Sequence, residues 1–194
     1  MVPILLCSIF SIAIIFERYV FLYQVSRQSR RVIDDVTLAL KRGRIQEAQA
    51  LCERVRSPVT QVFKAGIEAH ERSRQEIREA IADAGAQEVP LLEKSLSSLA
   101  TIAHVSPLLG LLGTVTGMVS VFQTIQERAT AVSVVDPSLL AKGIWEALIT
   151  TVAGLVVAIP SFVAYNYLVG KVQDIVLGME TAATELMNVL TQNK

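Results

Sequence analysis

The chain has 194 residues, and its 18 basic residues balance its 18 acidic ones, which indicates no nucleic acid or other polyanion as a partner. Apolar residues make up 52% of the chain and the mean hydropathy is +0.46, both high for a soluble domain of this size. Thirteen of the 18 basic residues lie between positions 24 and 98, and this segregation of charge is typical of a membrane protein.

The first apolar run, Val2–Phe16, is shorter than the roughly 20 residues that span a bilayer, but it continues past a charged pair to Tyr23. A signal peptide is the alternative interpretation. It is weakened because no positively charged segment precedes the run and no small-residue cleavage site closes it. We therefore predict a transmembrane helix over residues 1–23, with Arg18 and either Tyr19 or Tyr23 at the membrane interface.

Residues 24–98 follow with a helical pattern throughout and are predicted to form a cytoplasmic helical domain. Gly43 is expected to interrupt one helix, and Ser57, followed by a proline, to start the next. From Ser73 onward the pattern predicts a helix that runs directly into the next apolar run as one rod, bent at Pro90. A plain helical hairpin and an oligomer-forming collar explain this segment about equally well.

Two longer apolar runs complete the chain. Residues 99–125 contain no Asp, Glu, Lys or Arg, and residues 143–170 contain a single acid, Glu146. Both are predicted to be transmembrane helices. Residues 126–142 are then a periplasmic loop, and residues 171–194 a cytoplasmic C-terminal helix.

Orientation follows from the positive-inside rule, which places the basic flanks in the cytoplasm. We expect a multi-pass protein of a bacterial inner membrane, with the N-terminus in the periplasm and the C-terminus in the cytoplasm. The residues that carry this prediction are Arg18, Arg27, Arg30 and Arg31 after the first run, Lys94 before the second and Lys171 after the third, against only Arg128 and Lys142 in the remaining loop.

No catalytic signature is present in the sequence: there is no Gly-rich phosphate loop, no Ser/His/Asp set and no HEXXH motif. We therefore expect no enzyme activity, no cofactor and no metal site. His70 and His104 are interpreted as structural residues. Cys7 and Cys52 lie far apart, in spacings that indicate packing rather than a metal site or a disulfide.

Glu146 is the candidate working group, because a charged carboxylate within a membrane helix costs several kcal/mol and is functional by default. The alternative is a carboxylate at the membrane interface, beside Trp145. Thr150 lies one turn away, about 40° around a helix, and Thr151 lies about 140° away.

The second run carries a stripe of small residues and a threonine, Thr114, at helical spacing. Taken singly, each threonine is best explained by close helix contact. Together with Glu146 on an adjacent helix, the threonines suggest a polar path for protons or ions, because such a path needs groups that donate and accept. The residues predicted to serve helix packing are Gly110, Gly113, Gly117, Gly154, Pro107 and Pro160.

Three segments then resemble a known family. They are Pro107-Leu-Leu-Gly-Leu-Leu-Gly-Thr-Val-Thr-Gly117, Gly143-Ile-Trp-Glu-Ala-Leu-Ile-Thr-Thr-Val-Ala-Gly-Leu155 and Ala158-Ile-Pro-Ser-Phe-Val-Ala-Tyr-Asn166. Their order and spacing resemble the MotA/TolQ/ExbB proton-channel family. The likeness covers essentially the whole chain, and the three-span plan resembles ExbB and TolQ rather than MotA, which has four spans.

The resemblance implies an all-α subunit in a ring of five, around a dimer of a single-span ExbD/TolR-like partner that brings an aspartate into the pore. Proton-motive force would then be passed as motion to a TonB- or TolA-like protein. By motif position, Thr114, Glu146 and Thr151 match the polar residues of the family. Thr150 stands where the family often has alanine, and Thr116 replaces a common tryptophan.

Two other functions remain open. The chain could be a non-conducting scaffold that holds a partner helix, or a stator of a flagellar or gliding type.

The resemblance also leads us to expect that the chain starts almost inside its first span, without the periplasmic extension that many relatives have.

Overall fold

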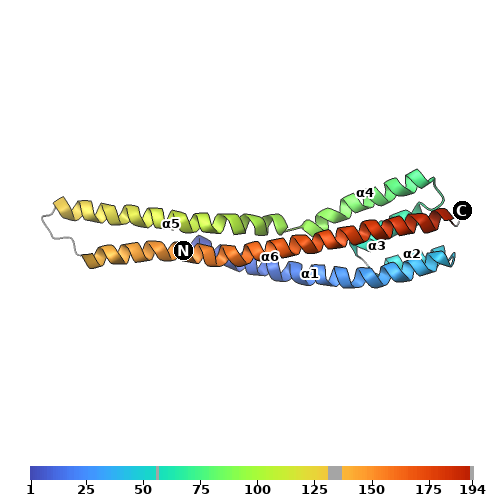
Figure 1. Ribbon diagram of the computed structural model, residues 1–194, viewed down its shortest axis with the longest axis horizontal. Helices are drawn as coiled ribbons and strands as arrows, with labels where there is room; N and C mark the ends of the chain where they lie inside the picture. The colour runs from blue at the N-terminus through green and yellow to red at the C-terminus, as the bar shows by residue number, and fades with distance from the viewer. Residues whose placement is uncertain (56, 131–136, 193–194) are drawn as a thin grey trace. The chain divides into compact units, whose positions relative to one another are not determined.

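The computed structural model describes residues 1–55, 57–130 and 137–192, which form six α-helices and no strand (Figure 1). Three stretches are long and apolar enough to cross a membrane: Val2–Lys41, Arg74–Glu127 and Leu140–Leu190. Their most apolar windows are only 11 to 22% buried by the chain itself, which leaves most of this surface for lipid or other protein. The prediction of an all-α chain with three candidate membrane helices is confirmed for these residues. The helices are α1 (Val2–Lys41), α2 (Ile45–Arg54), α3 (Pro58–Glu68), α4 (Arg74–Glu93), α5 (Leu96–Thr130) and α6 (Pro137–Gln192).

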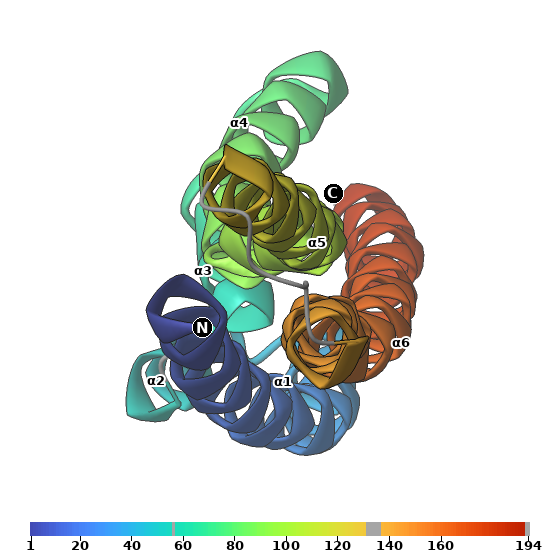
Figure 2. The ribbon, with the colours of Figure 1, turned by 90° about the vertical axis from the view of Figure 1, so that its left-hand side faces the viewer.

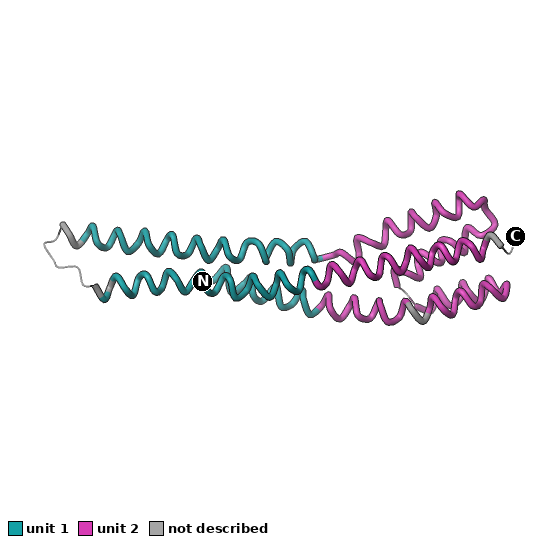
Figure 3. The backbone as a smooth tube through the Cα atoms, in the orientation of Figure 1, with its two compact units in different colours: residues 1–16, 95–166 teal, residues 17–94, 167–194 magenta. Residues whose placement is uncertain are grey.

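The chain divides into two compact units (Figure 3). Unit 1 comprises Met1–Phe16 and Ser95–Asn166, and so holds the start of α1, all of α5 and the first part of α6. Unit 2 comprises Glu17–Lys94 and Tyr167–Lys194 and holds the rest of α1 and α6 together with the three shorter helices. The candidate pathway residues all belong to unit 1.

In unit 1, α5 and α6 lie side by side and antiparallel (Figures 1 and 2). Their backbones approach closely because glycines stand at the contact. A Cβ atom added to Gly154 would lie 2.6 Å from the Ser106 carbonyl oxygen, and one added to Gly110 would lie 2.9 Å from the Thr151 Cα atom. Seven residues after Gly110 on α5, a Cβ atom added to Gly117 would lie 2.8 Å from the Ala147 Cβ atom.

The start of α1 joins this pair through a polar contact. The hydroxyls of Ser11 on α1 and Ser161 on α6 lie 2.6 Å apart, within hydrogen-bond distance, and both side chains are buried. Ser161 also donates to the Val157 carbonyl. A buried hydroxyl pair of this kind satisfies two polar groups that lipid could not.

In unit 2, the helix ends follow the signals in the sequence. Gly43, between α1 and α2, has a φ of +74°, a conformation that glycine adopts without a steric penalty. Ser57 caps α3 through a reciprocal pair of bonds with Thr60, and Ser73 caps α4 in the same way with Glu76. The predicted break at Gly43 and the predicted helix start at Ser57 are confirmed.

The core of unit 2 includes apolar side chains from α3, α4 and α6. α3 presents Phe63 and Ile67, α4 presents Ile77 and α6 presents Leu186, each at most 2% exposed. These side chains recur at the spacing of one helix face, so α3 and α4 form a hairpin whose apolar faces are covered within the unit.

The prediction of one rod from Ser73 into the second span is wrong. Pro90 lies within α4, but the helix ends at Glu93, and α5 begins at Leu96. Between them, Ser95 has a left-handed φ of +64°. A residue in this conformation ends a helix, because it turns the chain out of the i to i−4 hydrogen-bond pattern.

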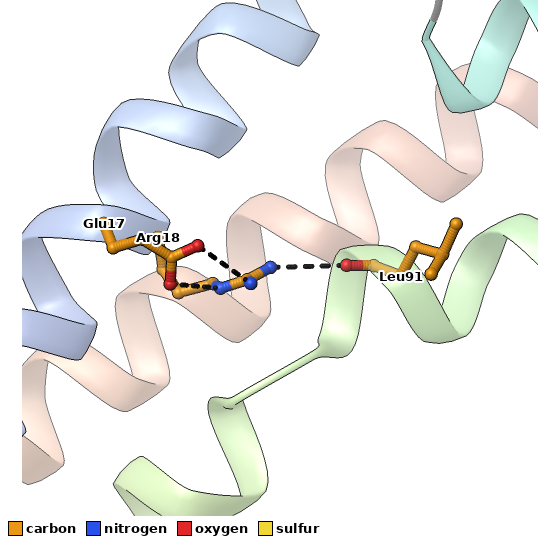
Figure 4. A network of polar contacts seen from close by, with 3 residues as sticks. All are labelled: Glu17, Arg18 and Leu91. Carbon is orange, nitrogen blue, oxygen red and sulfur yellow. Dashed lines mark hydrogen bonds and ion pairs between the residues drawn. The ribbon is translucent and has the colours of Figure 1, made fainter.

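The side chain of Arg18 on α1 is hydrogen-bonded to the C-terminal end of α4 (Figure 4). Its Nη1 donates to the Leu91 carbonyl at 3.3 Å, while its Nε and Nη2 each donate to a carboxylate oxygen of Glu17 at 3.0 Å. The guanidinium also lies over the Phe21 ring, 5.2 Å from its centroid. A cation at a helix C-terminus is stabilising, because the last carbonyls lack partners within the helix. Arg18 is only 4% exposed, so it points into the unit rather than outward to the membrane interface.

Replacing Gly154 with Ala is expected to push α5 and α6 apart, because the new methyl would overlap the Ser106 carbonyl. We expect the free energy of unfolding to fall by about 1–3 kcal/mol, measured by thermal unfolding in detergent. Gly170→Ala on the same helix is the matched control, since nothing lies within 4 Å of its Cβ position. The control should gain about 0.5 kcal/mol, and equal shifts in both variants would contradict the packing argument.

Replacing Arg18 with Met removes the cation but keeps much of the side-chain volume. The Leu91 carbonyl then loses its charged donor, so we expect a loss of about 2 kcal/mol in the free energy of unfolding. Arg42→Met is the control, because Arg42 is exposed and its side chain has no ion pair with any described residue. A thermal unfolding midpoint that changes equally little in both variants would show that the contact at Leu91 is not stabilising.

Candidate functional site

Thr150 lies in the contact between α5 and α6. Its Oγ1 donates to the Gly110 carbonyl across the contact at 3.1 Å and to the Ala147 carbonyl on its own helix at 2.7 Å. A Cβ atom on Gly113 would collide with the same side chain. The Thr150 side chain therefore packs against Gly113, which has no side chain, and its hydrogen bond to Gly110 links α5 to α6.

Thr151 differs from its neighbour. Its backbone passes close to Gly110, and its Oγ1 atom is buried without a hydrogen-bond partner among the residues that the structure describes. A buried hydroxyl without a partner costs about 1–3 kcal/mol. In native structures such a group is explained by stored strain, by a functional role or by an ordered water or ion.

Thr114 follows Gly113 on α5 and is half-buried. Its hydroxyl donates to the Leu111 carbonyl at 2.7 Å. This bond satisfies the hydroxyl proton and leaves the oxygen lone pairs able to accept a bond from elsewhere.

Glu146 is exposed and forms no hydrogen bond or ion pair with any residue that the structure describes. α6 begins at Pro137, six positions before the predicted span, so Glu146 lies in the third turn, about 14 Å along the helix axis. Neighbouring apolar residues are also exposed, including Trp145 at 67% and Leu148 at 55%. A carboxylate therefore stands on an apolar helix surface, and none of the described residues compensates its charge.

The two helices place these groups on different sides of their contact. At about 100° per residue, Thr114 lies about 60° from the middle of the contact face of α5, and Thr151 lies about 60° from that of α6 in the same sense. In an antiparallel pair, equal senses lead to the same side. Glu146 lies about 80° in the opposite sense. The structure thus brings Thr114 and Thr151 to one side of the pair and leaves Glu146 on the other.

The contact also uses Gly143 and Ala147, which the sequence analysis did not single out for packing. Ala147 meets Gly117, and a Cβ atom on Gly143 would collide with Val121. Gly143 and Ala147 are four positions apart, a small-xxx-small pattern that marks close helix contact in membranes. The pattern is visible in the sequence. Because Glu146 lies between these two residues, the segment was interpreted as a proton-path site rather than as a helix contact.

The remaining candidate groups have local roles. A ring nitrogen of His104 donates to the Ala100 carbonyl at 2.7 Å, and the ring packs edge-on against Phe162. Burial raises the pKa of the Cys52 thiol to about 11, so this residue stays protonated at neutral pH. Among the described residues, no group of three or more His, Cys, Asp and Glu side chains is placed to hold a metal ion.

Comparison with known proteins shows which proteins the chain resembles. A "putative biopolymer transport protein ExbB homolog" of Methanothermobacter thermautotrophicus is 32% identical over 159 residues, which cover 81% of this chain and 55% of that protein. A "putative biopolymer transport protein ExbB-like 3" of Synechocystis is 36% identical over 85% of this chain and 78% of its own length. The "Tol-Pal system protein TolQ" of Pseudomonas aeruginosa is 34% identical over 69% of this chain and 61% of its own length.

The chain thus spans 55% of the first of these relatives and 61% of the third. The model of the MotA/TolQ/ExbB proton channel family matches residues 54–181, which include the whole of the α5–α6 contact. The chain therefore belongs to the MotA/TolQ/ExbB proton channel family.

Proposed function

We propose that this chain is an inner-membrane proton-channel subunit that converts proton-motive force into mechanical work. It does so with a single-span ExbD/TolR-like partner and passes the work to a TonB- or TolA-like protein, for outer-membrane import or envelope integrity. The observation that carries the proposal is the exposed, unpartnered carboxylate of Glu146 on an apolar helix.

Burying a charged carboxylate in lipid costs about 3 kcal/mol or more, so protein or water covers this surface in the working assembly. The low burial of all three candidate membrane helices leaves surface on which such a cover can pack. Family membership favours a ring as the covering assembly, and we propose five copies around a partner dimer. The carboxylate is then part of an interior surface rather than an anchor at the membrane interface.

The proposed pathway uses hydroxyl and carboxylate groups that donate and accept protons. Thr114 and Thr151 form its wall on one side of the α5–α6 pair, where the Thr151 hydroxyl has no hydrogen-bond partner among the described residues. Glu146 joins the path from the other side, so a path that uses both sides is completed by a second copy of the chain. Thr150 contributes to packing rather than transfer, because its proton is engaged by two carbonyls.

Energy enters through a partner aspartate that alternates between charged and neutral forms. The two forms differ in affinity for a wall of hydroxyls and a carboxylate, and that difference can drive a step. One proton that crosses 100 mV releases about 2.3 kcal/mol, so useful work takes several protons or many strokes. We place the N-terminus in the periplasm and residues 24–98 and 171–194 in the cytoplasm, as the basic flanks favour.

Glu146→Gln and Thr114→Val are each expected to leave the oligomer intact and to reduce proton-dependent work at least about tenfold, because the path loses an essential group. Assembly with the partner is measured by native mass spectrometry. Function is measured as proton flux in proteoliposomes and as transport or envelope integrity in the host. Glu180→Gln, an exposed acid on the same helix beyond the predicted span, is the control.

Full activity in both variants would contradict the proton pathway. Loss of function that always accompanies loss of assembly would favour a passive scaffold. A neighbouring gene whose product carries a peptidoglycan-binding domain would favour a stator. A short neighbour with one N-terminal span and an aspartate within it would support the proposed system.

Thr150→Val and Thr151→Val make the same chemical change at adjacent positions. The first removes two hydrogen bonds, so the unfolding free energy should fall by about 1 kcal/mol. The second removes a hydroxyl to which no residue in the described part of the chain is hydrogen-bonded, so stability should hold or rise while proton-dependent work is lost. Thermal unfolding in detergent and proton flux in proteoliposomes separate the two effects. Full proton flux in Thr151→Val would exclude Thr151 from the pathway.

A further inference from the structure

Unit 2 contains a cavity of about 390 Å³ between α1 and α6 that the proton pathway does not use. Its lining combines three tyrosines, two cations, two leucines and a serine. These residues are Tyr19, Leu22, Tyr23, Ser26, Arg27, Tyr167, Leu168 and Lys171. Five of the eight lie at the C-terminal ends of the predicted first and third spans, and Ser26, Arg27 and Lys171 follow directly after them.

The tyrosines place the cavity at a membrane boundary. Tyr19 and Tyr167 stack across the two helices with ring centroids 6.3 Å apart, and Tyr19 and Tyr23 stack at 6.4 Å. The three residues are 49 to 60% exposed, so their rings are available to another molecule. Tyrosines gather where lipid headgroups meet hydrocarbon, because one end of the ring is polar and the other is not.

The charge of the cavity is positive. Its lining includes Arg27 and Lys171 and no acidic residue. Arg27 is exposed and has no ion pair with any described residue, while Lys171 has only a 3.8 Å contact to Asp174. Two cations with so little compensation match an anion that carries a phosphate group.

The floor of the cavity is apolar. Leu22 and Leu168 are each 1% exposed and lie at the base of the space between the two helices. A ligand that fits must therefore combine a negatively charged polar end with an apolar body. A free inorganic anion has no such body, and an apolar protein segment leaves both cations without a partner.

We propose that this cavity binds the headgroup of an anionic phospholipid, with the phosphate between Arg27 and Lys171 and the glycerol region over the two leucines. The tyrosine rings flank the headgroup. This site goes beyond the proton pathway and does not depend on it, because it requires only that α1 and α6 enter the bilayer.

The test uses the full-length chain in its native oligomer, purified in detergent and titrated with phosphatidylglycerol or phosphatidylcholine. Native mass spectrometry counts the lipids bound per chain. We expect preferential binding of phosphatidylglycerol. The double variant Arg27→Gln/Lys171→Gln should bind it about 30-fold more weakly, since each cation near a membrane surface strengthens binding about fivefold.

Two matched variants act as controls. Arg42→Gln/Arg54→Gln makes the same change in net charge at exposed positions outside the cavity and should bind like the unmodified chain. Arg27→Lys/Lys171→Arg keeps both charges and should retain the preference for phosphatidylglycerol. These results would together support a lipid site at the cavity.

Three outcomes would overturn the proposal. Equal weakening in both double Gln variants would show a general charge effect. Displacement of phosphatidylglycerol by excess inorganic phosphate alone would show a free-anion site. Loss of the oligomer only in the Arg27→Gln/Lys171→Gln variant would show that a neighbouring subunit, rather than a lipid, occupies the cavity.

Discussion

The close approach of the α5 and α6 backbones determines where every candidate pathway group of this chain lies. Glycines on both helices remove the side chains that would separate them, so the Cβ position of Gly154 comes within 2.6 Å of a carbonyl oxygen on α5. At such separations a helix has almost no freedom to rotate about its axis. The sides occupied by Thr114, Thr151 and Glu146 therefore follow from packing, and the Thr150 hydroxyl secures the contact.

Two charged residues, one in each unit, differ in how their charge is compensated. Arg18 is buried in unit 2, and a carboxylate, a helix-end carbonyl and an aromatic ring all compensate its charge. Glu146 lies in unit 1 on an apolar helix and has no compensating group among the described residues. The first is a self-contained structural contact. The carboxylate of Glu146 has no such contact among the described residues, and for this reason a ring and a partner helix are part of the proposed function.

The local elements were largely predictable from the sequence. Apolar runs marked the three candidate membrane helices, and Gly43 and Ser57 marked a break and a helix start at the observed positions. Local signals sufficed there, because a positive φ at glycine and a serine cap act within a few residues. The break at Ser95 was missed because local signals do not mark it. The Leu91 carbonyl, one helical turn before Ser95, accepts a hydrogen bond from Arg18, which is 73 positions away and is indicated by no local pattern.

The sequence by itself determined that this is an all-α membrane protein, because its long apolar runs match the length of membrane helices. It also determined that Glu146, Thr114 and Thr151 lie within these runs. Only the tertiary structure decided how these groups relate. Thr150 and Thr151 are neighbours of one residue type, yet one hydroxyl bridges the helices and the other has no hydrogen-bond partner in the part of the chain that the structure describes. Their difference depends on which side of α6 faces the glycines of α5, and that is a property of two packed helices rather than of either sequence alone.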